Sequence, residues 1–266
     1  MPPEQKVIII ASLVGSVRLP NSHYGRSFYE SETSSASSSA QEVIPIVQRL
    51  FQPRSVVDLG CGTGSWLAQF ERHGVEDVLG IDGDWVDPKT LQIDSKKFLL
   101  ADLSKPLRLR KRFDLVICLE VAEHLPLNCA DTLIDSLVLL GPKVLFSAAI
   151  PYQGGTGHLN EQWQDYWISK FRKRGLKVLD CIRPQIWGNR RISSYYRQNI
   201  LVFAEEDTLM NGHDSTSWRQ GMFSVVHPDY YLRFYDPKKF PANNFKVALA
   251  AVPWIMARGV RQLLEK

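Results

Sequence analysis

The residues that could do chemistry are grouped in short segments, and the first of these is a glycine-rich turn. Residues 58–64, with the sequence DLGCGTG, follow an apolar run and precede a segment with helical spacing. Glycines in a strand-to-helix turn permit backbone conformations that other residues avoid, and they let the main chain approach a ligand closely. The segment predicts a loop for a nucleotide-type ligand, with a ligand-free tight turn as the alternative.

Two further acidic residues follow apolar segments later in the chain. Asp82 closes the segment 77–81, where a carboxylate can accept hydrogen bonds from both hydroxyls of a ribose. Asp102 follows the segment 97–101, where it could accept from an adenine amino group while Leu103 offers a backbone amide and an apolar contact. Each acid alone could be a helix cap or a turn residue, but turn chemistry does not readily explain all three sites in succession.

Apolar runs alternate with helical patterns through the middle of the chain, and this alternation predicts the elements that position these residues. Strands with continuous apolar faces, separated by helices, are typical of a parallel sheet covered on both sides. We therefore expect an α/β fold with a doubly wound, mostly parallel seven-stranded sheet. The expected strands are 55–59, 77–81, 97–101, 113–119, 143–150, 177–182 and 199–204, and the expected helices are 43–50, 65–73, 129–139 and 162–174.

The two ends of the chain differ from this core. Residues 1–42 are predicted to form an N-terminal arm, with a short strand or ordered arm at 7–14 and a serine-rich segment at 31–40 that is a flexible linker or the approach to a helix. The main domain is predicted at 43–204. Residues 205–266 are predicted to form a C-terminal extension that ends in an amphipathic helix at 245–264, divided or kinked by Pro253.

Composition narrows the protein class. The 266 residues are 44% hydrophobic with a formal net charge of +4, which fits one main globular domain and does not demand a nucleic-acid partner. The apolar run 7–14 is far shorter than the roughly 20 residues of a membrane-spanning helix. The four cysteines have no paired metal-binding spacing, and three of them lie in or beside apolar runs, where a free thiol packs as a small apolar side chain, so we expect a reducing, cytoplasmic location.

The segments 57–64 (VDLGCGTG), 80–82 (GID), 101–103 (ADL) and 113–116 (FDLV) occur in this order and resemble the consecutive motifs of class I S-adenosylmethionine-dependent methyltransferases. The resemblance spans about residues 43–204 and implies a Rossmann-like fold with S-adenosyl-L-methionine as cofactor. It places Asp58 and the glycines beside the methionine part, Asp82 at the ribose and Asp102 at the adenine. The implied cofactor-binding residues are Asp58, Gly60, Cys61, Gly62, Gly64, Asp82, Gly83, Asp102, Leu103 and Glu120.

An NAD site is the competing interpretation of the glycine loop. It predicts G-x-G-x-x-G spacing, in which the third glycine follows Gly60 and Gly62. That position is Ser65 in this sequence, and an NAD site would leave Asp102 without a role.

A candidate metal site follows the fourth expected strand, in the segment CLEVAEHLP at 118–126. If the chain turns helical there, Glu120, Glu123 and His124 share one face, and His158 from a later glycine-rich loop could add a fourth ligand. This donor set suits Mg, Mn or Zn. The segment resembles that of small-RNA 3′-terminal 2′-O-methyltransferases and of ubiquinone-biosynthesis O-methyltransferases, which implies a divalent cation that holds the acceptor hydroxyls and helps to ionise one of them.

Without an ion, the same residues take other roles. Glu120 would then line the cofactor pocket, Glu123 and His124 would be polar groups at a helix start, and His158 would be a candidate general base. His158 and Glu120 are the candidate catalytic residues.

The acceptor site is predicted in the loop 149–163, which follows the fifth expected strand. Tyr152, Gln153 and Trp163 are its candidate substrate residues, although Trp163 has the spacing of a helix face packed on the core. Asn160 is the expected N-cap of the next helix. Trp187 and Arg190, in a second cluster of cations and aromatic residues, could also contact the acceptor, or the cluster could form a solvated hairpin.

These features predict a methyltransferase that acts on an oxygen, or less favourably a nitrogen, of a small-molecule or glycan-like acceptor. In-line methyl displacement needs mainly positioning of the reacting atoms. An RNA acceptor is not favoured, because no basic face with interleaved aromatic residues is evident. The alternative is a cofactor-binding regulatory or scaffold protein without catalysis, whose basic C-terminal helix binds a partner or a membrane surface. The sequence leaves the oligomeric state open.

Overall fold

The computed structural model describes residues 26–208 and 222–235. The chain divides into two compact units, residues 1–225 and 226–266. In the second unit the described helix is α7 (Pro228–Tyr235). No helix within the described ranges is long and apolar enough to cross a membrane.

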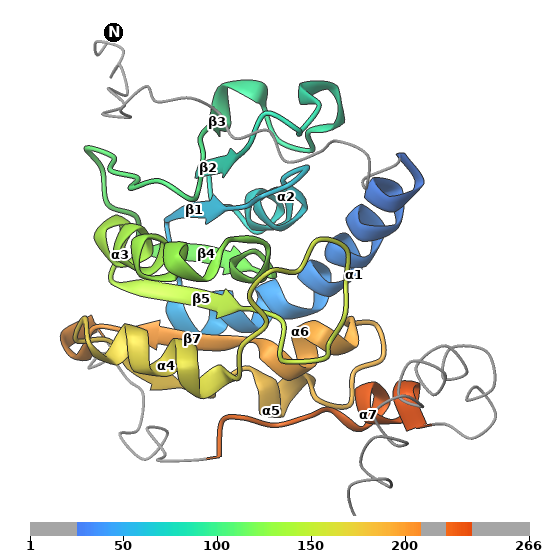
Figure 1. Ribbon diagram of the computed structural model, residues 1–266. Coiled ribbons are helices and arrows are strands. Elements are labelled where there is room, and N and C mark those ends of the chain that lie inside the picture. Colours follow the sequence, from blue (N-terminus) through green and yellow to red (C-terminus); the bar gives the residue numbers. More distant parts are fainter. Residues whose placement is uncertain (1–25, 209–221, 236–266) are drawn as a thin grey trace, which may run out of the picture. The chain divides into compact units, whose positions relative to one another are not determined.

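The first unit contains a seven-stranded sheet with the strand order β3-β2-β1-β4-β5-β7-β6 (Figure 1). Five strands run parallel, and β7 is antiparallel to both of its neighbours, β5 and β6. This confirms the predicted fold class. The strands are β1 (Ser55–Leu59), β2 (Asp77–Asp82), β3 (Phe98–Leu100), β4 (Leu115–Leu119), β5 (Lys143–Ser147), β6 (Lys177–Leu179) and β7 (Leu201–Ala204).

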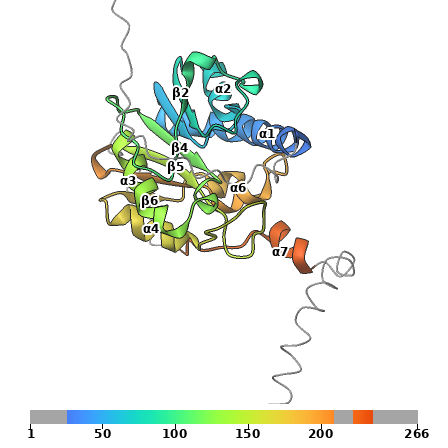
Figure 2. The ribbon, with the colours of Figure 1, turned by 45° about the horizontal axis from the view of Figure 1, so that its top comes forward.

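Helices cover both faces of the sheet (Figure 2). Successive strand residues point to opposite faces, so Val56 joins one apolar cluster and Val57 the other. The first cluster includes residues of α1 (Arg26–Phe51), α2 (Ser65–Arg72), α5 (Arg183–Ile186) and α6 (Ser194–Asn199). The second includes residues of α3 (Ala130–Leu140) and α4 (Gln164–Arg172). Short 3-10 helices occupy Pro88–Thr90, Ser95–Lys97, Ala122–His124, Leu127–Cys129 and Glu206–Thr208.

The strand order brings the predicted functional segments to one edge of the sheet. Strands β1 and β4 are neighbours, and the chain proceeds from this pair in opposite directions, through β2 and β3 on one side and β5 on the other. Ligands of open α/β sheets bind at such a switch point, beyond the carboxyl ends of the strands. The segments that follow β1, β2, β4 and β5 therefore converge there.

The serine-rich segment differs from its prediction. Residues 31–40 belong to the long helix α1 and are not a flexible linker. The hydroxyl of Ser39 donates to the carbonyl oxygen of Ser35 within the helix, and Ser35 hydrogen-bonds to the hydroxyls of Ser193 and Tyr195. Hydrogen bonds to residues distant in the sequence thus pair hydroxyls of this segment, whose serine-rich composition alone suggested a lack of structure.

Other helices and loops also differ from their predicted boundaries. Helix α4 begins at Gln164 after Trp163, so the prediction of Asn160 as its N-cap is wrong; the Asn160 side chain instead accepts a hydrogen bond from Gln162. The segment around residues 183–199 forms α5 and α6 and is not a hairpin. The predicted arm at 7–14 and the C-terminal helix at 245–264 lie outside the described residues.

Candidate active site

The glycine loop after β1 has the backbone that its sequence predicts. Gly60, Gly62 and Gly64 have φ angles of 82°, 52° and 79°, in the left-handed region that favours glycine. A Cβ atom at Gly60 would lie 2.3 Å from Cγ2 of Val121, in the segment that follows β4. The loop therefore packs directly against the neighbouring segment, and a side chain at Gly60 has no room.

Asp82, at the end of β2, holds this loop. Its Oδ2 accepts a hydrogen bond from the backbone N–H of Gly62 at 2.7 Å, and its Oδ1 accepts from that of Gly83 at 2.7 Å. Burial raises the pKa of the Asp82 carboxyl, and these hydrogen bonds oppose the shift. A ribose at this position would find a carboxylate already oriented by the glycine loop.

Trp85 adds a group that our sequence analysis missed. Its indole hydrogen-bonds to the Asp82 side chain, and its ring lies so close to Gly83 that a Cβ there would be 2.2 Å from it. The side chain is 51% exposed. An aromatic residue three positions after a strand-end acid was the available signal.

Asp58, at the end of the buried strand β1, lies near Asp82. Burial raises the pKa of the Asp58 carboxyl well above its usual value, and the charge of Asp82 raises it further. Two buried carboxyl groups at a ligand loop cost free energy unless a cation compensates them. The sulfonium and ammonium groups of S-adenosylmethionine carry that compensating charge, so the pair fits this cofactor.

Asp102 is exposed two residues after β3. Its Oδ1 accepts hydrogen bonds from the backbone N–H and the hydroxyl of Ser104, at 2.9 and 2.6 Å, which is the geometry of a turn residue. Leu103 is buried. The predicted contact of Asp102 with adenine stays a prediction.

Glu120 follows β4 with an unusual backbone. Its φ is 55°, which costs conformational energy for a residue other than glycine. The expectation that Glu120 shares a helix face with Glu123 and His124 is wrong, because the helical turn covers only Ala122–His124. The left-handed conformation at Glu120 turns the chain before that helix can begin.

Side-chain amides hold the Glu120 carboxylate. Its Oε2 accepts from Nε2 of Gln153 at 2.8 Å, and its Oε1 accepts from Nδ2 of Asn199 at 3.1 Å. The same Asn199 amide donates to Oε1 of Gln153 at 2.9 Å, and Gln198 donates to Oδ1 of Asn199 at 3.1 Å. Burial raises the pKa of Glu120, and the amide hydrogen bonds oppose this.

Asn199 and Gln198 were missed by our sequence analysis. Asn199 is only 2% exposed and Gln198 is fully buried, at the end of α6. Our prediction placed Asn199 at the start of the last strand, where its side chain had no assigned partner. Two adjacent amide residues beside an apolar run were the available signal.

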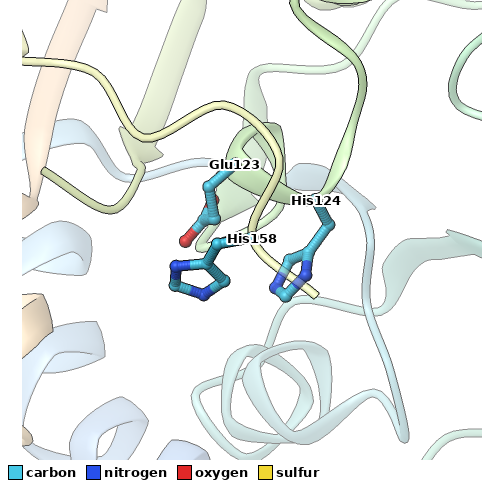
Figure 3. Close-up of side chains that lie close together, drawn as sticks. All are labelled: Glu123, His124 and His158. Carbon is cyan, nitrogen blue, oxygen red and sulfur yellow. The ribbon is translucent and has the colours of Figure 1, made fainter. Parts of the chain in front are cut away.

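Glu123, His124 and His158 lie together at the same edge (Figure 3). One potential ligand atom from each residue lies within 4.8 Å of the other two. The Glu123 side chain is completely buried; its Oε1 accepts from the backbone N–H of Ala149 at 3.1 Å. Within the described part of the chain, Oε2 of Glu123 and Nδ1 of His124 have no hydrogen-bond partner.

The electrostatics of this cluster reflect its burial. Burial raises the pKa of Glu123 well above its usual value, and the nearby Glu120 raises it further. Burial lowers the pKa of His124 to about 4, with His158 contributing, while a hydrogen bond to the backbone of Gly157 opposes the shift. Because buried polar atoms normally have partners, the two unpartnered atoms fit a bound cation. A carboxylate with two imidazoles suits Zn²⁺ better than Mg²⁺, which prefers oxygen ligands.

The loop between β5 and α4 covers this cluster. The backbone N–H groups of Leu159 and Asn160 donate to the carbonyl oxygen of Glu123 at 2.7 and 3.0 Å. Tyr152 is 88% exposed and Trp163 is 43% exposed, whereas Gln153 is buried in the amide network. Trp163 precedes α4 and is partly exposed, so its interpretation as part of a helix face packed on the core is wrong.

The second predicted substrate cluster follows α5. Arg190 is exposed, and the carbonyl oxygen of Trp187 accepts a hydrogen bond from Arg197 at 3.1 Å. The neighbouring Asn189 donates a hydrogen bond to Glu42 in α1, and Arg191 forms an ion pair with the same carboxylate. The roles of Trp187 and Arg190 in acceptor binding stay predictions.

Comparisons with known proteins agree with this arrangement. A family model described as a methyltransferase domain matches residues 35–180, more than half of the chain. No curated protein matches the sequence.

Similar solved structures include a protein described as an O-methyltransferase from Nostoc punctiforme PCC 73102, which is 13% identical with a TM-score of 0.52, over 67% of this chain and 59% of that one. DesVI from Streptomyces venezuelae is 14% identical with a TM-score of 0.50, over 67% and 95% of the two chains. The sugar N-methyltransferase KedS8 from Streptoalloteichus sp. ATCC 53650 is 16% identical with a TM-score of 0.50, over 73% and 99%. At these identities, the structures support the fold. The family match, together with this fold, shows that the chain belongs to the class I S-adenosylmethionine-dependent methyltransferases.

Proposed function

We propose that the protein transfers a methyl group from S-adenosylmethionine to a hydroxyl oxygen of a small-molecule or glycan-like acceptor, assisted by a divalent cation. The observation that carries the proposal is the pair of buried, unpartnered atoms, Oε2 of Glu123 and Nδ1 of His124, beside His158. Glu123, His124 and His158 would hold the cation. Glu120, which we expected to bind the cation together with these three residues, is engaged by the amides of Gln153 and Asn199.

The residues of the glycine loop support the cofactor half of the reaction. Asp82 would orient the ribose, and the buried pair Asp58 and Asp82 would stabilise the positive charge of the cofactor. S-adenosylmethionine supplies a methyl group on a positively charged sulfur, which an in-line nucleophile displaces. The protein's task is then mainly to hold the acceptor oxygen in line and to exclude water.

The residues after β4 and β5 support the acceptor half. A divalent cation supplies Lewis acidity, which lowers the pKa of a bound hydroxyl. Glu120 is the candidate group that accepts the hydroxyl proton while His158 holds the cation, since a buried carboxyl with a raised pKa is a stronger base than an exposed one. Tyr152 and Trp163 would contact the acceptor through two exposed aromatic rings, and the buried Gln153 would orient the Glu120 carboxylate beside it.

We also propose a reducing, cytoplasmic location. Cys61, Cys118, Cys129 and Cys181 are all free thiols. Buried free cysteines pack as small apolar side chains and persist where disulfides do not form.

The proposal is tested by incubating the purified protein with methyl-labelled cofactor and fractionated cell extract, with and without a chelator. We expect label in a small-molecule or glycan fraction, and we expect the chelator to abolish it. Glu123→Ala and His124→Ala should each abolish the methyl transfer, and added Zn²⁺ should not restore it.

Matched controls come from the opposite end of the sheet and from the surface. His73→Ala and Glu205→Ala change an exposed imidazole and an ion-paired surface carboxylate, and both should retain activity. Label transfer that is indifferent to the chelator would contradict the cation. Cofactor binding without label in any fraction would favour a regulatory or scaffold protein.

A further inference from the structure

Glu161, within the acceptor loop 149–163, accepts three hydrogen bonds from earlier residues of that loop. Its Oε2 accepts from the backbone N–H of Tyr152 at 2.8 Å, and its Oε1 accepts from that of Gly154 at 2.9 Å. The same Oε1 lies 2.8 Å from Nδ1 of His158. One side chain thus joins the start of the loop to the imidazole near its end.

This contact determines which nitrogen of His158 carries a proton in the neutral ring. A carboxylate offers only acceptor atoms, so Nδ1 of His158 must be the donor. The proton on Nδ1 leaves Nε2 with its lone pair. A histidine that binds a cation or accepts a proton needs such a lone pair, and hydrogen bonding at the other nitrogen fixes the tautomer.

The loop also restricts the position of the ring. A Cβ atom at Gly155 would lie 2.2 Å from Nε2 and 2.4 Å from Cε1 of His158, so the glycine backbone packs directly on the imidazole. The ring of His124 approaches from another direction, with its centroid 4.9 Å away at 87°. The His158 side chain is only 13% exposed.

The backbone at Tyr152 shows that the loop conformation is imposed. Its φ of 66° is unfavourable for a residue with a large side chain, and the side chain itself is 88% exposed and gains little from packing. The hydrogen bond from its N–H to Glu161 is a stabilising contact that accounts for this conformation.

We propose that Glu161 is a positioning residue: its carboxylate sets the Nδ1–H tautomer and the orientation of His158 and holds the loop 152–158 over the site. The role in turnover rests on the function proposed for His158 above. The statement about the tautomer does not depend on that function.

The test uses the full-length, cation-free protein with ¹⁵N-labelled histidine. Two-bond ¹H–¹⁵N correlation spectra are recorded at about pH 8, where histidines of unperturbed pKa are neutral. The signals of His158 are assigned by comparison with His158→Asn. We expect the pattern of a ring protonated at Nδ1 in the parent protein, and in Glu161→Ala, which removes the acceptor, a shift towards the Nε2–H tautomer that free histidine prefers.

Turnover provides the second readout. Loss of such a supporting contact typically costs about 10–100-fold in activity or metal affinity, and we expect that loss in kcat for Glu161→Ala, with the affinity for S-adenosylhomocysteine unchanged. Glu205→Ala, which removes a carboxylate paired with Arg112 at 2.7 Å, should change neither readout.

The outcomes separate this inference from the proposed function. An Nε2–H pattern for His158 in the parent protein overturns the inference even if Glu161→Ala does not fold. An unchanged tautomer and unchanged kcat in a folded Glu161→Ala also overturn it. The expected spectra without methyl transfer to any acceptor would contradict the proposed function while supporting the role of Glu161 in setting the tautomer.

Discussion

Replacing Gly60 with alanine should destabilise the protein more than the same change at any glycine with free space around it. The φ of 82° costs an alanine about 1–2 kcal/mol. The new Cβ would also lie 2.3 Å from Cγ2 and 2.9 Å from Cγ1 of Val121. Overpacking of this kind costs about 1–3 kcal/mol, because a β-branched side chain has little rotamer freedom to move away. The sum is about 2–5 kcal/mol, or a fall in Tm of about 4–20 °C for a domain of this size.

Gly74→Ala is the matched control for Gly60→Ala. Gly74 has a similar φ of 86°, and no heavy atom lies within 4 Å of its Cβ position. It should therefore lose only the conformational part, about 1–2 kcal/mol. Urea and thermal unfolding of the cofactor-free variants measure the difference.

A double variant isolates the steric part. Val121→Ala removes both Cγ atoms, so Gly60→Ala with Val121→Ala should be about 1–3 kcal/mol more stable than the sum of the single changes predicts. Equal losses in Gly60→Ala and Gly74→Ala, with additive behaviour in the double variant, would refute the reasoning that the glycine loop packs on the segment after β4.

Three other changes give distinct results. When folding raises the pKa of a carboxyl group, the free energy of unfolding of the protein falls as the pH rises from the group's unfolded pKa, about 3.9, through its folded pKa. Asp58→Asn should therefore raise the Tm of the cofactor-free protein at pH 7, and this gain should disappear towards pH 4. The same variant should bind the cofactor more weakly in calorimetry. Asn199→Ala removes the amide that donates to Oε1 of the buried Glu120 and leaves the amide of Gln153 on Oε2, which should cost about 1–3 kcal/mol in urea unfolding and lower kcat more than cofactor affinity. Tyr152→Gly relieves an unfavourable φ but gives the unfolded chain more conformational entropy, and these two effects oppose each other. The free energy of unfolding should therefore stay within about 1 kcal/mol of that of the parent protein, while KM for the acceptor rises. A large loss of stability would contradict this.

The cofactor side of the site could be predicted from the sequence because its signals are local. The turn glycines and the strand-end Asp82 depend on spacing within one strand-loop-helix unit, and the alternation of elements predicted the sheet that positions them. The left-handed φ values and the hydrogen bonds from Gly62 and Gly83 to Asp82 agree with that interpretation.

The acceptor side depends on contacts between distant segments and was predicted less well. Asn199 reaches Glu120 only because β7 inserts beside β5, and no local pattern specifies that pairing. The positive φ of Glu120 broke the helix that spacing alone suggested. Ser35 in the helix α1 hydrogen-bonds to a partner about 160 residues away in the sequence, which no local pattern indicates. Asp102 accepts a hydrogen bond from Ser104, and such local side-chain hydrogen bonds often compete with other contacts.

The central claim, that this chain binds S-adenosylmethionine through its glycine loop and Asp82, is tested most directly by calorimetric titration with S-adenosylhomocysteine. The parent protein and Asp135→Ala, which changes an exposed carboxylate paired with Arg174, should bind with one site and equal affinity. Asp82→Ala should bind at least tenfold more weakly, a loss of about 1.4 kcal/mol or more. Equal affinity in Asp82→Ala, or no binding to the parent protein, would contradict the account.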